Sequence, residues 1–217
     1  MNAVPVSVVD YGIGNLYSVG RALEHCGASV TLAHDAAAIA AATRLVLPGV
    51  GAFADGMQGL RERGLVDAIR DYAASGRSLL GICLGMQMLA GVSEEFGRHA
   101  GLDLIPGRVE PVPATTVDGR PQKIPHVCWS SLRQPAGANW TGSVLQHSAP
   151  DTAVYLVHSF HVVPDNPAHV LAHCVYGGHA ITAAIRSHNI TGCQFHPEKS
   201  GPAGLRMLCE FVGSGAA

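Results

Sequence analysis

The first half of the chain alternates short apolar runs with longer stretches in which apolar residues recur at helical spacing. The apolar runs have the length of buried strands and cover residues 6–10, 29–33, 44–47 and 78–80. The stretches between them predict helices over residues 16–26 and 36–42, one or two helices over 56–75, and a helix over 84–90. Strands that alternate with helices in this way predict a parallel sheet with helices on both faces.

The second half has a different pattern, in which short β-rich segments are separated by proline and glycine. These segments cover residues 108–112, 124–129, 153–163, 170–175 and 190–195, and a final helix is predicted over 203–212. Short strands of this kind favour antiparallel pairing. We therefore predict an α/β fold with an open mixed, mostly parallel sheet flanked by helices. No linker-like run divides the chain, so a single domain is predicted over residues 1–217.

The composition is that of a globular chain and excludes several classes of function. Apolar residues make up 47% and charged residues 14% of the 217 residues, which argues against a disordered chain. A net charge of −2 gives no basic surface for nucleic acid. No run approaches the roughly 18 apolar residues of a membrane span, and residues 1–5 lack the basic segment of a secretory signal. We therefore expect a cytoplasmic protein without nucleic-acid or membrane partners.

Neither the cysteines nor the histidines have the spacing of a metal site. The six cysteines are scattered over a chain of ordinary size, so we predict reduced thiols rather than a disulfide framework. His158 and His161 would face opposite sides of a strand, and His169 and His173 would lie about 13 Å apart in an extended chain. These separations are too wide for one ion, so we expect no metal and no other cofactor.

A glycine-flanked cysteine joins the fourth predicted strand to the helix that follows it. Gly81-Ile82-Cys83-Leu84-Gly85 has the form of a nucleophile elbow, a sharp turn in which the residues two before and two after the nucleophile crowd each other. Glycine at both positions removes the Cβ atoms that would clash. Cys83 would then lie at a helix N-terminus, where the helix dipole and free N–H groups favour the thiolate. A buried structural cysteine is the alternative interpretation.

A second reactive group follows the strand predicted over residues 190–195. In His196-Pro197-Glu198, proline biases the preceding residue toward an extended conformation, and residues two apart then point to the same side. Glu198 can therefore orient His196, which serves Cys83 as a base. An incidental surface turn is the alternative. Together with Cys83, the pair supplies a nucleophile, a base and an orienter, which is the constellation for acyl transfer.

Two glycine-rich turns follow other predicted strands. Gly12 and Gly14 begin a turn like that of dinucleotide sites, but Tyr17 replaces the third glycine of that fingerprint, which favours an ordinary strand-to-helix turn. Pro48-Gly49-Val50-Gly51 lies at the carboxyl end of a strand, where open α/β sheets place their ligands. Two glycines around one valine let this peptide reorient at low cost and aim a backbone N–H at a developing oxyanion.

These motifs resemble the class I, or triad, glutamine amidotransferases. The elbow continued to Gln87 and the run His196-Pro197-Glu198 carry this resemblance. Four further stretches resemble the glutaminase subunits of imidazole glycerol phosphate synthases, namely residues 10–16, residues 47–53, Pro125-His126 with Trp129, and the extension Lys199-Ser200. The resemblance runs from Val6 to about Phe211, and its motifs are jointly specific.

The resemblance implies a role for each matching residue. Cys83 attacks the side-chain amide of glutamine, His196 is the acid and base, and Glu198 orients His196. The N–H groups of Leu84 and, after a peptide rearrangement, Val50 form the oxyanion hole. Glutamine is held by the residues around this centre, which are Gly49, Gly51, Gln87, Glu95, Ser159 and Phe160. Ammonia leaves, water cleaves the glutamyl thioester, and glutamate is released.

The resemblance also implies a partner protein. In this family the glutaminase binds a (β/α)8-barrel cyclase, which receives the ammonia through an internal passage and forms imidazole glycerol phosphate, a histidine precursor. Asn15, Trp129, Tyr155 and Lys199 match positions at that interface. Trp129 and Tyr155 would equally suit an ordinary apolar core.

The chain departs from the family pattern in two places. After Pro125-His126 the family has Met-Gly-Trp-Asn, where this chain has Val127-Cys128-Trp129-Ser130. After Ser159 it has two tyrosines or similar residues, where this chain has Phe160 and His161. Both places belong to the side that faces the partner in the family. The departures therefore bear on the acceptor enzyme rather than on the triad.

Three other functions compete with this one. A paralogous amidotransferase would supply ammonia to a different synthase, such as one that amidates a sugar nucleotide. A stand-alone cysteine hydrolase of similar fold would keep the elbow but would not require Gln87, Glu95 or the run from His196 to Ser200. A non-catalytic nucleotide-binding module would use the glycine turns, which Tyr17 disfavours.

Overall fold

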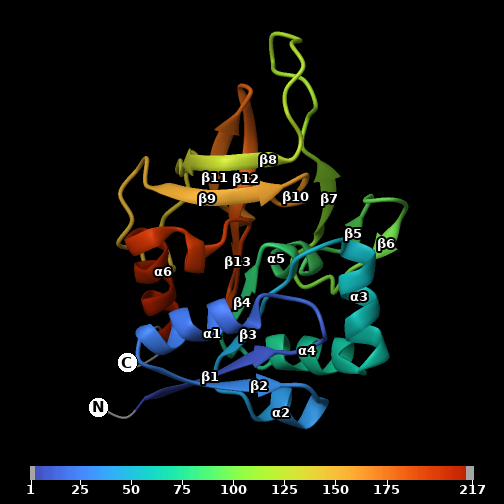
Figure 1. The fold of residues 1–217 in the computed structure, drawn as a ribbon, viewed down its shortest axis with the longest axis vertical. Helices are drawn as coiled ribbons and strands as arrows, with labels where there is room; N and C mark the ends of the chain where they lie inside the picture. Colours follow the sequence, from blue (N-terminus) through green and yellow to red (C-terminus); the bar gives the residue numbers. More distant parts are fainter. Residues whose placement is uncertain (1–2, 214–217) are drawn as a thin grey trace.

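Apolar runs from both halves of the chain form parallel strands that lie side by side in one seven-stranded sheet (Figure 1). The parallel strands stand in the order β2 (Ala28–Ala33), β1 (Val4–Val9), β3 (Leu45–Leu47), β4 (Leu79–Ile82) and β13 (Ile190–Cys193). Two antiparallel strands, β12 (His179–Ser187) and β11 (Val170–Tyr176), extend the sheet beyond β13. The computed structural model describes residues 3–213, and within them this sheet is mixed and mostly parallel, as predicted.

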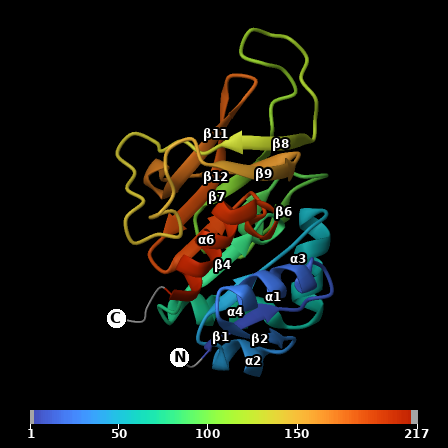
Figure 2. The ribbon, with the colours of Figure 1, turned by 60° about the vertical axis from the view of Figure 1, so that its left-hand side comes forward.

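Helices cover both faces of the sheet. One face carries α1 (Leu16–His25) and α6 (Gly201–Gly213), which pack against each other (Figure 2). The other face carries α2 (Ala36–Ala41), α3 (Phe53–Glu62), α4 (Leu65–Ala74) and the short α5 (Leu84–Met88). Across the described part of the chain, no helix combines the length and the apolarity that a membrane crossing needs.

Local sequence explains where several of these helices begin. The side chains of Asn15 and Asp35 accept hydrogen bonds from backbone N–H groups in the first turns of α1 and α2, so both residues are N-caps. The stretch predicted as one or two helices is two, α3 and α4. Gly64 separates them with φ of 66°, a left-handed conformation that glycine adopts without strain.

Alternate strand residues divide the apolar core between the two faces. On β1, Val6 and Val8 pack in the core beneath α1 and α6. On β3, Val46 joins the same core, whereas Leu45 and Leu47 pack beneath the helices of the opposite face. This period of two is expected of strands that are buried on both sides. It explains why these strands appear in the sequence as continuous apolar runs.

Two smaller sheets, formed by residues after α5, lie beyond the carboxyl ends of the parallel strands, toward the top of Figure 1. One contains, in order, β10 (Phe160–Pro164), β7 (Gly107–Pro111), β5 (Val92–Ser93) and β6 (His99–Ala100). The other pairs β8 (His126–Ser131) with β9 (Ala153–His158) in antiparallel register. Short 3₁₀ turns, η1 (Pro167–His169) and η2 (Pro197–Lys199), precede β11 and α6.

Some strands differ from the prediction. The β-rich segment over 153–163 forms two strands, β9 and β10, which belong to different sheets and meet at Ser159. The long strand β12 was not predicted, although its residues 181–185 are buried in the main sheet. β5 and β6 are two residues long, and so short a strand has no recognisable period.

One cysteine pair corrects the prediction that all six thiols are reduced. Cys26, at the end of α1, forms a disulfide with Cys209 on α6, and their Cα atoms lie 4.7 Å apart. The two residues are 183 positions apart in sequence, and they meet because both helices pack on the same face of the sheet. The spacing of the cysteines along the sequence therefore gave no sign that two of them are neighbours in the folded chain. The remaining cysteines are free thiols: Cys83, Cys128, Cys174 and Cys193.

Candidate active site

Cys83 stands at the predicted elbow, between the end of β4 and the first residue of α5. Its backbone has φ of 54° and ψ of −111°, a conformation that is strained for any residue other than glycine. A Cβ atom on Gly81 would lie 2.9 Å from the backbone of Gly85, and one on Gly85 would overlap the carbonyl oxygen of Leu47. The two glycines therefore permit the sharp turn at Cys83, as the pattern predicts.

His196 reaches Cys83 because β13 lies next to β4. Cys193 pairs with Ile82 in parallel register, and the backbone N–H of Cys83 donates to the Cys193 carbonyl at 2.7 Å. The chain beyond β13 therefore emerges beside the elbow. There His196 Nδ1 lies 3.0 Å from Glu198 Oε1, and the two side chains are 5% and 1% exposed. This confirms the predicted pairing of residues two apart.

Electrostatics favour a protonated His196. Burial alone would lower the pKa of this imidazole, but hydrogen bonds to Cys83 and Glu198, and the negative charges of both groups, raise its pKa to about 9. An imidazolium at this place can donate one N–H to the sulfur and the other to the carboxylate. The site thus contains a cation that is able to give a proton to a departing group.

These residues open onto a cavity of about 280 Å³. It is lined by Val50, Gly51, Cys83, Leu84, Gln87, Glu95, Pro125, Val157, His158, Ser159, Phe160 and His196. All the residues predicted for glutamine binding lie on this wall except Gly49, which packs behind it. A Cβ atom on Gly49 would lie 2.9 Å from the Cβ of Leu84, so glycine allows the loop to approach the elbow closely.

The loop that carries Gly49 and Val50 is braced by Tyr11, a residue to which sequence analysis gave no role. The Tyr11 hydroxyl donates to the Pro48 carbonyl at 2.8 Å, and the side chain is buried. Burial, and then the charge of Cys83, raises the pKa of Tyr11, so the phenol stays protonated and remains a donor. In the sequence, the only indication of a role for Tyr11 is its position in the turn after the first predicted strand.

Gln194 is a second residue that sequence analysis missed. It is fully buried, its Oε1 accepts from Gln87 Nε2 at 3.1 Å, and its own Nε2 lies 3.7 Å from Cys83 Sγ. Gln87 Nε2 also donates to the Phe160 carbonyl at 3.1 Å. A signal was present, because a polar residue within the apolar run predicted as a strand over residues 190–195 needs a buried hydrogen-bond partner.

Glu95 holds the start of α3 against the cavity. Its Oε2 accepts the backbone N–H of Phe53 at 2.6 Å, and its own N–H donates to Ser93 Oγ at 3.1 Å. A carboxylate at a helix N-terminus satisfies free N–H groups and complements the helix dipole. Glu95 thus has a structural partner as well as a place on the cavity wall.

The residues predicted for the partner interface lie on elements that contact one another. Trp129 on β8 is 55% exposed and meets Tyr155 on β9 edge to face, with ring centroids 6.0 Å apart. β9 packs against η2, which carries the exposed Lys199, and η2 packs against α1, which begins after Asn15. The Tyr155 carbonyl accepts the N–H of His196 at 3.1 Å, so this region touches the candidate catalytic residues directly.

The positions that depart from the family pattern do not all face outward. Val127 is 47% exposed, but Cys128 and Ser130 point to the other side of β8, where both contact His126. His161 is buried, and burial lowers its pKa. The side chains of Cys128, Ser130 and His161 are therefore turned into this chain, while the assignment of both segments to the partner-facing side stays a prediction.

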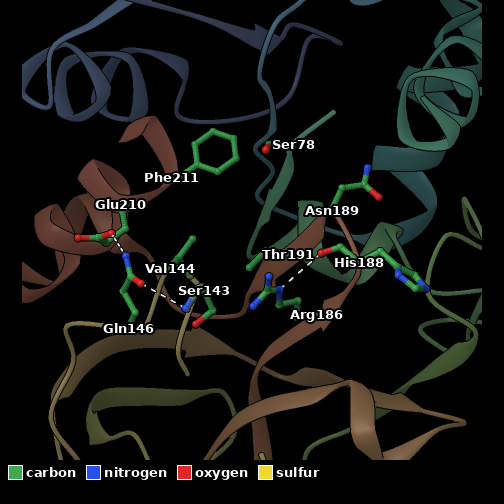
Figure 3. A pocket seen from close by; sticks show the side chains of 11 residues that line it. Ser78, Ser143, Val144, Gln146, Arg186, His188, Asn189, Thr191, Glu210 and Phe211 are labelled. Carbon is green, nitrogen blue, oxygen red and sulfur yellow. Dashed lines mark hydrogen bonds between the residues drawn. The ribbon is translucent and has the colours of Figure 1, made fainter. Parts of the chain in front are cut away.

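A second cleft of similar volume, about 290 Å³, lies between α6 and the strands β12 and β13 (Figure 3). It includes Ser78, which precedes β4, so it stands at the opposite end of that strand from Cys83. Gln146 spans it, hydrogen-bonded to Glu210 and to the backbone of Gly142. The elbow and His196 do not line this cleft, and the chemistry belongs to the cavity at Cys83.

Proteins of similar sequence support the interpretation of this cavity as an amidotransferase site. The family model described as glutamine amidotransferase class-I matches residues 7–213. The chain is 50% identical to imidazole glycerol phosphate synthase subunit HisH 1 of Legionella pneumophila (strain Paris), over 95% of this chain and 98% of that protein. It is 45% identical to subunit HisH of Geobacillus thermodenitrificans (strain NG80-2), over 96% of this chain and 95% of that protein.

A solved structure shares the fold at much lower identity. PurLQS from Thermotoga maritima matches with a TM-score of 0.70 and 18% identity, over 98% of both chains. At this identity the similarity concerns the fold alone. The sequence matches establish that the chain belongs to the class I glutamine amidotransferase family, and within it to the group of HisH subunits.

Proposed function

We propose that this chain is the glutaminase subunit of an imidazole glycerol phosphate synthase and acts in histidine biosynthesis. The observation that carries the proposal is the cavity at the elbow, which Cys83 and His196 both line and where His196 is paired with Glu198. The identity to HisH subunits over nearly the whole chain supports the choice of pathway. We also propose a single amidotransferase domain over residues 1–217 and a cytoplasmic location, as in the sequence analysis.

The proposed reaction forms and breaks a thioester on Cys83. The sulfur attacks the side-chain carbonyl carbon of glutamine, and His196 gives its proton to the nitrogen that leaves as ammonia. Water then attacks the thioester, His196 takes a proton from it, and Cys83 is released together with glutamate. Glu198 keeps the imidazole in the orientation that both steps need.

The negative oxygen that develops on the substrate needs hydrogen-bond donors. The N–H of Leu84, the first residue of α5, is one, and the N–H of Val50 is the other after its peptide reorients. Glutamine itself is held by the cavity wall, through Gly49, Gly51, Gln87, Glu95, Ser159 and Phe160. Because the Val50 peptide must reorient first, we expect the isolated chain to be a weak glutaminase. Vigorous glutamine hydrolysis without a partner would contradict the need for this reorientation.

The ammonia goes to a (β/α)8-barrel cyclase, which forms a heterodimer with this chain. We assign the contact to the region that holds Asn15, Trp129, Tyr155 and Lys199. Support comes from the exposure of Trp129 and from the hydrogen bond between Tyr155 and the backbone of His196. A paralogue that feeds another synthase would share the same triad, so the acceptor is decided by assay.

The experiment measures glutamate release by the chain alone, with the cyclase, and with the cyclase and its ribonucleotide ligand. We expect strong stimulation that requires both additions. Hydrolysis without stimulation would keep the triad chemistry and exclude this acceptor.

Substitution of the nucleophile separates the two activities of the complex. Cys83→Ala should abolish glutamine hydrolysis and leave synthesis from added ammonia intact, because ammonia bypasses the elbow. A glutamine-analogue electrophile should label only Cys83, and glutamine should block the labelling. Loss of both activities in a folded complex would show that Cys83 has a different role, and the absence of labelling would favour a non-catalytic binding module.

A further inference from the structure

Two buried histidines lie against each other at the catalytic cavity: His158 lines it, and His126 lies behind His158. His126 on β8 and His158 on β9 are register partners, 0% and 5% exposed. His126 Nδ1 lies 3.0 Å from His158 Nε2, and His158 Nδ1 lies 2.8 Å from the Phe160 carbonyl oxygen. Burial lowers the pKa of both imidazoles, that of His158 to about 4, so both are neutral near pH 7. The catalytic mechanism above uses neither group.

The Phe160 carbonyl determines where the protons of this pair lie. A carbonyl oxygen only accepts hydrogen bonds, so neutral His158 carries its proton on Nδ1 and presents a lone pair at Nε2. His126 must then donate from Nδ1, which makes its own Nε2 an acceptor. Cys128 Sγ and Ser130 Oγ lie 3.0 and 3.1 Å from that Nε2, and each can donate. The hydrogen bonds therefore run in one direction, from β8 to Phe160.

The series of hydrogen bonds through His126 and His158 reaches the catalytic cavity at the Phe160 carbonyl. The oxygen also accepts from Gln87 Nε2, whose second hydrogen goes to Gln194 Oε1. Gln194 in turn presents its Nε2 to Cys83. With both of its N–H hydrogens engaged, the Gln87 amide offers its acceptor oxygen to a ligand rather than a donor. The orientation of this amide thus depends on a carbonyl that His158 holds.

We propose that His126 and His158 are positioning residues, a one-way hydrogen-bond relay that holds the Phe160 carbonyl and through it the Gln87 amide. The inference rests on the proposed function, which assigns this cavity to glutamine. Neither histidine touches the reacting atoms. Cys128 and Ser130 supply the outer donors, and these are two of the positions at which the chain departs from the family pattern.

Nitrogen-15 NMR of the histidine rings in the full-length chain tests the relay without any enzyme assay. We expect His126 and His158 as neutral Nδ1–H tautomers at pH 7, with Nδ1 protons that exchange slowly with water. The exposed His188 serves as an internal reference with fast exchange. An Nε2–H tautomer, or a protonated ring, at His158 would overturn the relay.

Removal of the outer donors extends this test. In the double variant Cys128→Ala with Ser130→Ala, the Nε2 resonance of His126 should shift, because that atom loses its donors. The tautomer of His158 should persist, since the Phe160 carbonyl still requires it. An unchanged His126 resonance would show that the relay does not extend to these side chains.

Kinetics of the complex with the cyclase test the positioning role. An asparagine amide can replace the Nδ1 donor of histidine, whereas a glutamine amide reaches only the Nε2 position. His158→Gln should therefore raise the KM for glutamine by about tenfold, the order expected for one buried hydrogen bond, with a smaller effect on kcat. His158→Asn should stay closer to the wild type.

Two controls distinguish a failure of the positioning role from a failure of the proposed function. His34→Phe, on a histidine whose side chain is 71% exposed, should leave KM unchanged. A wild-type complex without glutaminase activity would overturn the proposed function and with it the positioning role, while the NMR experiment still decides the relay. An active wild type with equal KM in His158→Gln and His158→Asn would overturn the positioning role alone.

Discussion

At the residue scale, His196 is the centre of the site's electrostatics. It interacts with both Cys83 and Glu198, and these interactions outweigh the burial that would otherwise favour the neutral ring. Its pKa of about 9 means that the imidazolium persists over the whole physiological range of pH. An acid that is charged before the substrate arrives needs no further proton to release ammonia.

The protonation of His196 should give the glutaminase activity a measurable pH dependence. Glutaminase activity of the wild-type complex should fall as the pH rises through about 9, where His196 loses its proton. Glu198→Gln removes the partner carboxylate, so the basic limb should move to lower pH by about one to two pH units. Activity should also fall about 10²-fold or more, because the ring loses its orienter. An unmoved basic limb in a pH–rate profile would contradict this assignment.

The same group links pH to the stability of the fold. A pKa above the ordinary value of 6.5 means that the folded chain binds the proton more tightly than the unfolded chain. The stabilising contribution is therefore fully present below pH 6.5 and is lost as the pH rises through about 9. Urea denaturation of the wild type and of Glu198→Gln at pH 7 and pH 10 should show a larger loss of stability in the wild type.

At the scale of elements, the elbow depends on space that only glycine leaves. Gly85→Ala places a methyl group on the Leu47 carbonyl of the neighbouring strand, which cannot give way without moving β3. We expect a loss of about 1–3 kcal/mol in the free energy of unfolding, as for overpacked sites, together with loss of glutaminase activity.

A matched glycine provides the control for that substitution. Gly20 lies within α1, and a methyl group there meets only Val30 at 3.8 Å, an ordinary contact. Gly20→Ala should raise stability by about 0.5–1 kcal/mol through helix propensity. Denaturation curves that show equal effects of the two substitutions would contradict the steric account of the elbow.

The disulfide joins the two helices on one face of the sheet. Because Cys209 is exposed, Cys209→Ser removes the bond without opening the core. In oxidising buffer the variant should be less stable than the wild type by about 2–4 kcal/mol, and in reducing buffer the two should agree. If oxidised and reduced wild type unfold at the same urea concentration, the bond contributes no stability.

The sequence was informative wherever local rules decide the structure. The elbow and the alignment of His196 with Glu198 both follow from short-range geometry. Tyr11 and Gln194 were missed, because each acts through a partner far away in sequence. Cys26 and Cys209 show the same limit: tertiary packing brings them together, and no local pattern records it.

At the scale of the whole molecule, the chain has two dissimilar ends. β8 and β9 lie at one end and the edge strand β2 at the other in both ribbon views (Figures 1 and 2). Exposed apolar side chains occur at each end, Trp129 on β8 and Leu32 on β2, with 55% and 49% exposure. Only the first adjoins the catalytic cavity, because β9 is bonded to the backbone of His196.

This difference predicts which end binds the cyclase. Tryptophan is enriched among interface hot spots, so Trp129→Ala should weaken association by about 2 kcal/mol or more, roughly 30-fold in Kd. Leu32→Ala removes a similar apolar side chain from the far edge and should leave Kd unchanged. Titration calorimetry with the cyclase measures both. If Leu32→Ala weakens binding and Trp129→Ala does not, the partner binds at the opposite end, and ammonia has no short route from Cys83 to its acceptor.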